Sequence, residues 1–278
     1  MKNTILLFAA MGWCFIPNSG VDTQKFKKSV RLGQTGGQPK QVKRAGPDRP
    51  DRLDGERADT VSLLYDQAHG EQPPPGQMDA IAKKLGLEIH ASARPLDAEA
   101  LKGVRILYLR APSKEFAAAE TEAIVSFVKG GGSLLLVLDE ERRQSLEKTG
   151  VNNLITPFGL RLTPDTEYLH NCGGIAQAGE INKAVRELPF SGGRAVEGGT
   201  AFAFQLDQGG KPAQPFGAYK RLANGARVVV LGEGMASLFL GVPDGVRLAG
   251  VPNDPTRTTY WGKDSAIFME ELLAWLSR

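Results

Sequence analysis

The chain has 278 residues, of which 41% are hydrophobic and 23% are charged. This apolar content excludes disorder along the whole chain, and the length suits one large domain or two small ones. The net charge of +3 and the isoelectric point of about 8.8 suggest nucleic-acid binding at first sight. Residues 59–278, however, carry 23 basic and 26 acidic side chains. Because this segment is slightly acidic, we predict no nucleic-acid partner.

The first twenty residues have the pattern of a secretory signal peptide. Lys2 precedes an apolar run over Ile5–Ile16, and the polar and small residues of 17–20 break it. The run is too short for a spanning helix, which takes about 20 residues. We therefore predict a signal peptide at 1–20 and an exported protein, periplasmic or extracellular. A buried N-terminal strand or helix is the alternative.

Residues 21–58 have the composition of a disordered linker. They contain ten basic and five acidic residues and show no hydrophobic period. We interpret this segment as a solvated basic spacer. The alternative is a basic arm that touches an anionic lipid or polymer, and membrane contact is expected only through this linker.

From residue 59 onward, predicted strands alternate with predicted helices. Apolar and β-branched runs predict four strands, at 60–66, 87–93, 104–111 and 133–138. Apolar residues at helical spacing predict helices at 78–85 and 113–128. Ser113 is the expected cap of the second helix, and the glycines of 130–132 are expected to end it. Strand, helix and strand with short connections predict a parallel sheet.

The second half of this segment changes in character. A helix is predicted at 151–158 and a strand at 160–163, and frequent Gly and Pro over 165–225 then predict antiparallel hairpins. One strand of this region is expected at 201–206. The apolar strand 227–231 returns to the parallel sheet, and a helix near 265–276 closes the chain. Residues 59–278 are thus predicted to be one α/β domain, with a mostly parallel sheet and an antiparallel hairpin excursion near 165–225.

These pieces, in this order, resemble the class I glutamine amidotransferase-like superfamily. The segments that carry the resemblance are DQAHGE, VSFVKGGGSLLLVLDEE, NNLITPFGLRLTPD, RVVVLGEG and KDSAIFMEELLAWLS. The nearer resemblance is to the non-catalytic branch, which includes a domain shared by gliding-motility ABC-transport components and an intraflagellar-transport protein, and bacterial domains of unknown function. The resemblance implies a flavodoxin-like three-layer sandwich.

The residues that catalyse the amidotransferase reaction are missing from the matching positions. In those enzymes a Cys on a sharp turn follows the strand that matches SLLLVL, whereas here Asp139, Glu140 and Glu141 follow it. The late His-x-Glu pair is also missing, because no histidine follows His170. The resemblance therefore implies the fold without the amidotransferase mechanism.

Polar side chains follow several of the predicted strands. Ligands of open α/β sheets bind outside the carboxyl ends of the strands. The candidate ligand-binding residues there are Asp66, His69, Glu71, Arg110, Ser113, Asp139, Glu140 and Glu233. Such a set suits a divalent cation or a polyhydroxylated ligand such as a carbohydrate. The alternative is that they cap helices and tie loops. Since no Cys/His spacing typical of a metal site occurs, we predict no metal and no cofactor.

The sequence favours a protein that is not an enzyme. The leading hypothesis is an exported, catalytically degenerate amidotransferase-like domain that binds a small ligand or a partner protein of the cell envelope. The first alternative is a hydrolase that uses the strand-end carboxylates and His69. The second is a structural component of an envelope or ABC-transport assembly.

Overall fold

The computed structural model describes residues 61–71, 77–165, 173–188, 190, 193–207, 209–233 and 264–278. All of these belong to the unit Asp54–Arg278. The predicted signal peptide at 1–20 and the predicted linker at 21–58 lie outside the described residues.

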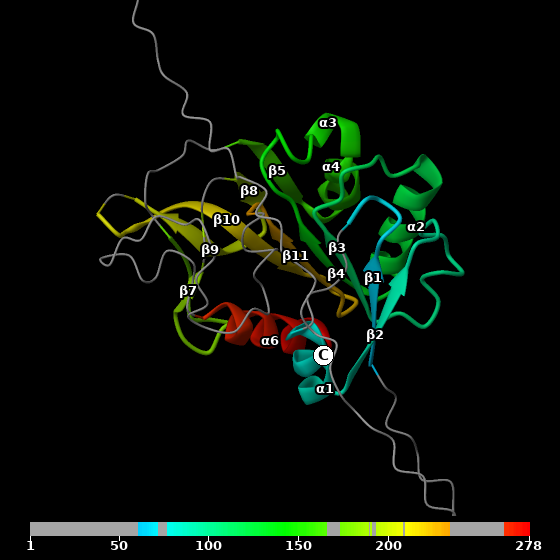
Figure 1. The fold of residues 1–278 in the computed structure, drawn as a ribbon, viewed down its shortest axis with the longest axis horizontal. Coiled ribbons are helices and arrows are strands. Elements are labelled where there is room, and N and C mark those ends of the chain that lie inside the picture. The colour runs from blue at the N-terminus through cyan, green and yellow to red at the C-terminus, as the bar shows by residue number, and fades with distance from the viewer. Residues whose placement is uncertain are drawn as a thin grey trace, which may run out of the picture. The chain divides into compact units, whose positions relative to one another are not determined.

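Five strands form the parallel end of a nine-stranded mixed sheet (Figure 1). Their order is β2-β1-β3-β4-β11, and each neighbouring pair is parallel. Their bounds are β1 (Val61–Asp66), β2 (Leu87–Ser92), β3 (Ile106–Arg110), β4 (Ser133–Val137) and β11 (Arg227–Leu231). Every residue of β3, β4 and β11 is buried, which explains their nearly continuous apolar sequences.

The sheet continues beyond β11 with antiparallel strands. Their order is β10-β9-β6-β7, and β10 pairs with β11. Their bounds are β6 (Gly174–Ala176), β7 (Arg186–Leu188), β9 (Thr200–Leu206) and β10 (Pro212–Arg221). The prediction of an α/β fold with antiparallel strands near 165–225 is confirmed, but the sheet is parallel at one end only. A separate two-stranded sheet pairs β5 (Leu160–Asp165) with β8 (Arg194–Gly198).

Two hydrophobic clusters pack against the sheet. One contains side chains of α1 (Gln77–Leu85) and α6 (Ser265–Leu276), and the other contains side chains of α2 (Ala118–Lys129) and α4 (Val151–Ile155). In β3, Tyr108 belongs to the first cluster and its neighbours Leu107 and Leu109 to the second. This alternation is expected of a strand that is buried on both faces.

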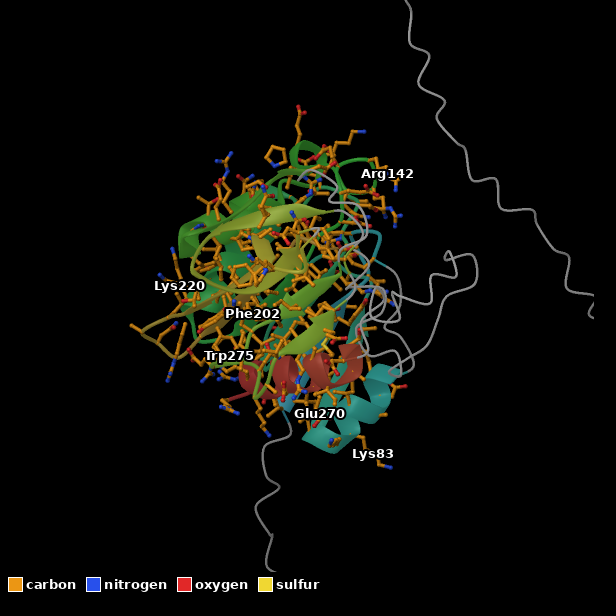
Figure 2. The ribbon with its side chains drawn as sticks, turned by 90° about the vertical axis from the view of Figure 1, so that its left-hand side faces the viewer. Lys83, Arg142, Phe202, Lys220, Glu270 and Trp275 are labelled. Atoms are coloured by element: carbon orange, nitrogen blue, oxygen red, sulfur yellow. The ribbon has the colours of Figure 1, made fainter. Side chains whose placement is uncertain are left out.

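Helices α1 and α6 lie side by side on their cluster (Figure 1). An ion pair of 2.7 Å between Lys84 Nζ and Glu270 Oε2 joins their exposed sides. Phe202 and Trp275 belong to the first cluster, while Lys220 lies at the surface (Figure 2).

Helix α2 begins later than the sequence predicted. It starts at Ala118 rather than near Ser113, which lies in the loop after β3. It ends where predicted, since the Gly130 N–H donates to carbonyls of the last turn. The helix predicted at 151–158 is α4 followed by the short 3-10 helix η1 (Thr156–Phe158), and α3 (Leu146–Thr149) precedes it.

Candidate functional site

Six of the eight predicted residues at the carboxyl ends of the parallel strands are buried, whereas Ser113 is exposed and Glu140 is half-buried. The exposed fraction is 0% for Asp66 and Glu233, 4% for His69 and Arg110, and 5% for Asp139. A buried polar group is tolerated only where it has partners, so the surroundings of each side chain decide what it can do.

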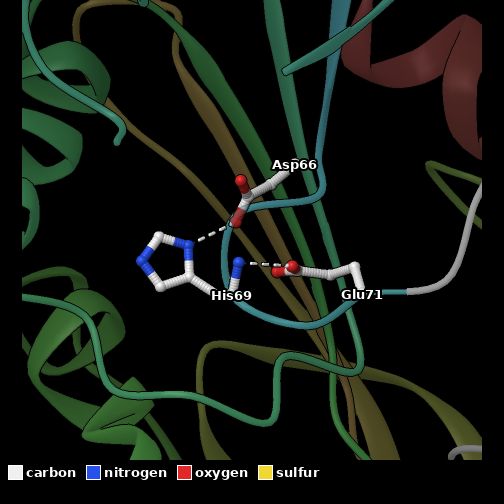
Figure 3. A group of neighbouring side chains, drawn as sticks. All are labelled: Asp66, His69 and Glu71. Carbon is white, nitrogen blue, oxygen red and sulfur yellow. Dashed lines mark hydrogen bonds and ion pairs between the residues drawn. The ribbon is translucent and has the colours of Figure 1, made fainter. Parts of the chain in front are cut away.

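The loop after β1 folds around the side chain of Asp66 (Figure 3). Asp66 Oδ1 accepts the Ala68 N–H at 3.0 Å, and Asp66 Oδ2 lies 2.6 Å from His69 Nδ1. The His69 N–H donates to Glu71 Oε2 at 2.9 Å. An aspartate followed by a short polar stretch favours such a turn, because its carboxylate accepts backbone N–H groups two residues on.

The same loop is docked on the loop after β3. The N–H groups of Ser113 and Lys114 both donate to the His69 carbonyl, at 2.8 and 3.0 Å. Gly70 allows this approach, since its φ is +83° and a Cβ there would lie 2.3 Å from Ser113 Oγ. Ala111, in the loop after β3, has a φ of +51°, which is unusual for a residue with a Cβ.

Glu120 of α2 completes the surroundings of the His69 ring. Its Oε2 lies 3.3 Å from His69 Nε2, and its carboxylate also accepts the N–H groups of Leu96 and Ala117, both at 3.0 Å. The ring stacks on Phe116 with centroids 3.9 Å apart. The imidazole is therefore fixed on its face and at both nitrogens.

Burial and charge shift the pKa values in this cluster in different directions. Burial, together with the neighbouring Asp66 carboxylate, raises the pKa of Glu71 to about 9, so this group is protonated at neutral pH. Burial alone would lower the pKa of His69, but the contacts of Asp66 and Glu120 outweigh it and raise that pKa. The pKa of Glu120 lies below its usual range: burial opposes this, but the Leu96 and Ala117 N–H groups and His69 prevail. The arrangement places an imidazole of raised pKa between the side chains of Asp66 and Glu120, with the neutral carboxyl of Glu71 beside them.

Arg110, at the end of β3, turns toward the aromatic pair beneath this loop. Its Nη1 donates to the Tyr65 hydroxyl at 3.4 Å, and the ring of Tyr65 meets that of Tyr108 edge-on at 5.0 Å. Burial raises the pKa of Tyr65, although the charge of Arg110 opposes the rise.

Asp139 and Glu140, after β4, pair with arginines of their own loop. Arg143 lies 3.1 Å from Asp139 Oδ2 and 3.1 Å from Glu140 Oε1, and Arg142 Nε donates to Glu140 Oε1 at 2.5 Å. Burial raises the pKa of Asp139, against the Glu140 N–H and the charge of Arg143. These two acids therefore form a second polar group, separate in its contacts from the cluster at His69.

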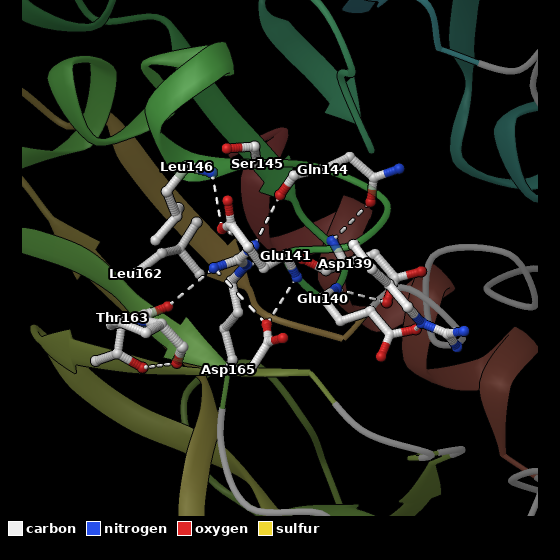
Figure 4. Close-up of polar contacts among 12 residues, drawn as sticks. Asp139, Glu140, Glu141, Gln144, Ser145, Leu146, Leu162, Thr163 and Asp165 are labelled. Carbon is white, nitrogen blue, oxygen red and sulfur yellow. Dashed lines mark hydrogen bonds and ion pairs between the residues drawn. The ribbon is translucent and has the colours of Figure 1, made fainter. Parts of the chain in front are cut away.

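A buried arginine from β8 holds the loop after β4 in place. Figure 4 shows Asp139, Glu141 and Gln144 of this loop near Thr163 and Asp165 of β5. Arg194 is 0% exposed. Its Nε donates to the Asp139 carbonyl at 2.7 Å, and its Nη2 donates to the Gln144 carbonyl at 2.7 Å and to Glu141 Oε2 at 2.8 Å. Its Nη1 donates to the Thr163 carbonyl at 3.3 Å. Hydrogen bonds from Ser145, the Leu146 N–H and Arg194 lower the pKa of Glu141 to about 2.

Of the eight predicted residues, the structure brings three tightly together. Asp66, His69 and Glu71 each offer a ligand atom, and these atoms lie within 4.8 Å of one another. Ser113 touches this group through its backbone, whereas Asp139 and Glu140 form the second group. Glu233 is buried just after β11.

Sequence reasoning missed three residues of these groups: Phe116, Glu120 and Arg194. Glu120 did carry a signal, since it stands three residues after the N-cap Ala117, where an acid can reach back to the cap N–H. Arg194 carried none, because its partners lie some 30 to 55 residues away along the chain.

The fold and the two polar groups define an α/β domain whose strand-end side chains bind one another and fasten loops. The chain belongs to the IFT52 GIFT domain family, whose match covers residues 64–240.

Two curated relatives agree with this family, and one solved structure has a similar fold. The chain is 27% identical to the intraflagellar transport protein 52 homologues of Mus musculus, over 161 residues, and of Homo sapiens, over 179 residues. These matches cover 53% and 59% of this chain but only 36% and 39% of the relatives, so the chain spans well under half of their length. The mmIFT52 N-terminal domain has a similar fold, with a TM-score of 0.50 at 18% identity over 63% of this chain and 86% of that one.

These comparisons correct the predictions of location and function. The periplasmic or extracellular location of an exported, secreted protein is wrong, because the relatives are intraflagellar transport proteins. The hypothesis of a degenerate amidotransferase-like domain that binds a ligand is wrong for the same reason. The two alternative hypotheses, a hydrolase and a component of an envelope or ABC-transport assembly, are wrong for the same reason. Within the described residues, no helix is both long and apolar enough to cross a membrane.

Proposed function

We propose that this protein is a protein-binding module of a multi-subunit transport assembly. The observation that carries the proposal is the family match over residues 64–240, together with relatives named as intraflagellar transport protein 52 homologues. The proposed partners are proteins, and neither a nucleic acid nor a membrane is part of the proposal.

The geometry of the strand ends supports a binding surface rather than a reactive centre. His69 is held at both ring nitrogens and at its backbone carbonyl, and Arg194 fastens the loop after β4 through four acceptors. Loops fixed in this way lose little conformational entropy when a partner binds. We therefore place the partner at this edge of the sheet, over the loops after β1, β3 and β4.

The mass of the assembly in the source cells tests the function. The full chain, tagged and expressed at its native level, should be recovered in a particle far heavier than the 29.9 kDa of the chain, with a fixed set of proteins in constant ratio. Recovery as a free chain, with no protein at a constant ratio, would contradict the proposal.

Two matched charge reversals test the location of the surface. Arg142 lies in the loop after β4 and Lys102 lies ahead of β3, and their side chains are 72% and 76% exposed. Arg142→Glu should lower recovery of the partners severalfold, while Lys102→Glu should leave it unchanged. Equal recovery in both variants would exclude the strand-end edge as the docking surface.

We also propose that the parallel end of the sheet is the flavodoxin-like core of the class I glutamine amidotransferase-like superfamily. The order β2-β1-β3-β4-β11 supports this, since flavodoxin-like sheets have the strand order 2-1-3-4-5. The helices α1 and α6 on one cluster and α2 and α4 on the other support three layers. A crystal structure of the full chain tests this. Its five parallel strands should superpose on a flavodoxin-like sheet, and a different order or connection of these strands would contradict the proposal.

The proposed domain covers residues 59–278, with residues 21–58 as a linker. Limited proteolysis tests this division, because a protease cuts exposed chain that lacks fixed structure. The stable product should begin close to residue 59. A stable product that retains residues 21–58 would contradict the boundary.

A further inference from the structure

We propose that Asp66, His69 and Glu71 form a site for one divalent transition-metal ion of the zinc type. The proposal goes beyond the protein-binding function and does not depend on it. Zinc is bound in proteins by nitrogen, sulfur and oxygen ligands, and this cluster offers one imidazole nitrogen and two carboxylates.

The three side chains converge from a single turn (Figure 3). One ligand atom from each lies within 4.8 Å of the others. Around a zinc ion with bonds of about 2.0–2.1 Å, neighbouring ligand atoms stand roughly 3–4 Å apart. Small side-chain movements within the turn therefore bring the three atoms to bonding distance of one ion.

One oxygen of the cluster has no hydrogen-bond partner in the part of the chain that the structure describes. Glu71 Oε2 accepts the His69 N–H, but Glu71 Oε1 is buried and has no hydrogen bond among the described residues. The whole residue is 8% exposed. A buried carboxyl oxygen without a partner is costly, and a cation bound beside it would satisfy it.

The surroundings of His69 match those of a metal ligand. A histidine that binds a metal through one ring nitrogen almost always donates the other N–H to a carboxylate or carbonyl. Glu120 Oε2 lies 3.3 Å from Nε2, and the Leu96 and Ala117 N–H groups hold that carboxylate in place. Glu120 thus holds the proton on Nε2, while zinc would replace the proton on Nδ1, because metal ligands bind deprotonated.

The donor set also selects the class of ion. Calcium and magnesium prefer oxygen ligands alone, whereas an imidazole suits zinc, copper, iron and nickel. Zinc would displace the proton of Glu71, because metal ligands bind in their deprotonated form. The two carboxylates then supply the negative charge that a divalent ion needs.

Calorimetric titration of the full chain with zinc chloride, after removal of metals with a chelator, tests the proposal. We expect one zinc ion per chain. Glu71→Gln keeps the shape of the side chain but cannot lose a proton to become a charged ligand, and should weaken zinc binding at least about tenfold. Glu120→Gln removes the contact that orients His69 and should weaken it about 10–100-fold.

Two histidine variants serve as controls. His90 is half exposed on β2, 3.5 Å from Glu88, and His170 is the third histidine of the chain. His90→Ala and His170→Ala should bind zinc as the wild type does. The proposal is overturned if zinc does not bind, if Glu71→Gln binds it as tightly as the wild type, or if either control variant loses it.

A spectroscopic signature in the wild type keeps the test independent of variant folding. Zinc should shift the ¹⁵N resonance of His69 Nδ1 far more than that of Nε2. Shifts confined to His90 or His170 would overturn the proposal. If zinc does not bind, the mass expected for the protein assembly does not change. The zinc site and the protein-binding function are therefore tested separately.

Discussion

The loop after β1 and the loop after β4 occupy equivalent places in the sheet, yet opposite charges organise them. The first gathers three acids, Asp66, Glu71 and Glu120, around one histidine. The second is organised by Arg194, whose guanidinium donates to three carbonyls and one carboxylate. Each nitrogen of this buried guanidinium has a hydrogen-bond acceptor, whereas the acidic cluster keeps a buried oxygen without a partner among the described residues.

This difference shows that two buried polar groups at one sheet edge can serve different ends. The arginine group is explained by loop positioning alone, because carbonyl acceptors need no further ligand. The acidic group also holds its loop, but it contains three carboxyl groups and only one basic side chain, His69. A positive ion could therefore bind there. Four predictions test this contrast, from the largest expected change in the free energy of unfolding to the smallest.

The largest effect is expected at Arg194. Arg194→Met removes the guanidinium and leaves buried carbonyls without donors, which should lower the free energy of unfolding by roughly 3–5 kcal/mol. Arg161→Met is the matched control, since Arg161 is exposed on β5 and lies 3.8 Å from Glu197. Its effect should stay below about 0.5 kcal/mol. Urea denaturation measures both, and similar losses would contradict the special role of Arg194.

The pH dependence of stability should change in Glu71→Gln. The folded pKa of Glu71, about 9, exceeds its usual value of 4.5. The contribution of Glu71 is therefore complete below pH 4.5 and is lost as the pH rises toward 9. From pH 6 to pH 8, metal-free wild type should lose up to about 2.7 kcal/mol, at most about 1.4 kcal/mol per pH unit, and Glu71→Gln should lose much less. Urea denaturation at several pH values with a chelator measures this. Parallel curves would mean that Glu71 is not protonated in the fold.

A third prediction concerns the ring of His69. His69→Phe keeps the stacking on Phe116 but leaves the carboxylates of Asp66 and Glu120 without the imidazolium, so stability at pH 6 should fall by about 1–3 kcal/mol. The raised pKa of His69 means that its contribution is complete below pH 6.5 and is lost as the pH rises. The gap between variant and wild type should therefore narrow at alkaline pH. His90→Phe, on an exposed site, is the control, and a gap that widens with pH would contradict the charge assignment.

The smallest effect is expected at Gly70. Gly70→Ala places a Cβ at a φ of +83° and 2.3 Å from Ser113 Oγ, and should cost about 1–2 kcal/mol. The double variant with Ser113→Ala removes the contact with the hydroxyl and keeps the strain of the backbone. Recovery of part of the loss in the double variant, measured by thermal unfolding, would separate the two causes. Wild-type stability of Gly70→Ala would mean that the loop moves away from β3.

The parallel end of the fold could be predicted because its strands are buried on both faces. The runs at 104–111, 133–138 and 227–231 are nearly continuous in apolar residues, and the structure places β3, β4 and β11 there. Strand β10 was not predicted, because Pro212, Pro215 and Gly217 interrupt it. The pairing of β10 with β9 shifts register at these positions. Such irregular pairing depends on the neighbouring strands and leaves no regular pattern in the sequence.

Only those residues of the candidate site that lie at the ends of predicted strands could be predicted from the sequence. Asp66 ends β1, and His69 and Glu71 follow it within five residues, so one turn brings the three together. Glu120 and Arg194 reach their partners across long stretches of chain, and these contacts depend on how the elements pack. The pairing of acids with Arg143 likewise depends on a loop whose path the sequence did not indicate.

The protonation of His69 tests the central claim most directly. In the metal-free full chain, ¹⁵N resonances of the histidine rings can be assigned with His90→Ala and His170→Ala. At pH 6.5, where an ordinary histidine is about half protonated, the His69 ring should be largely an imidazolium with protons on both nitrogens. A neutral ring that titrates below pH 6.5 would contradict the account, because Asp66 and Glu120 would then not enclose a positive charge.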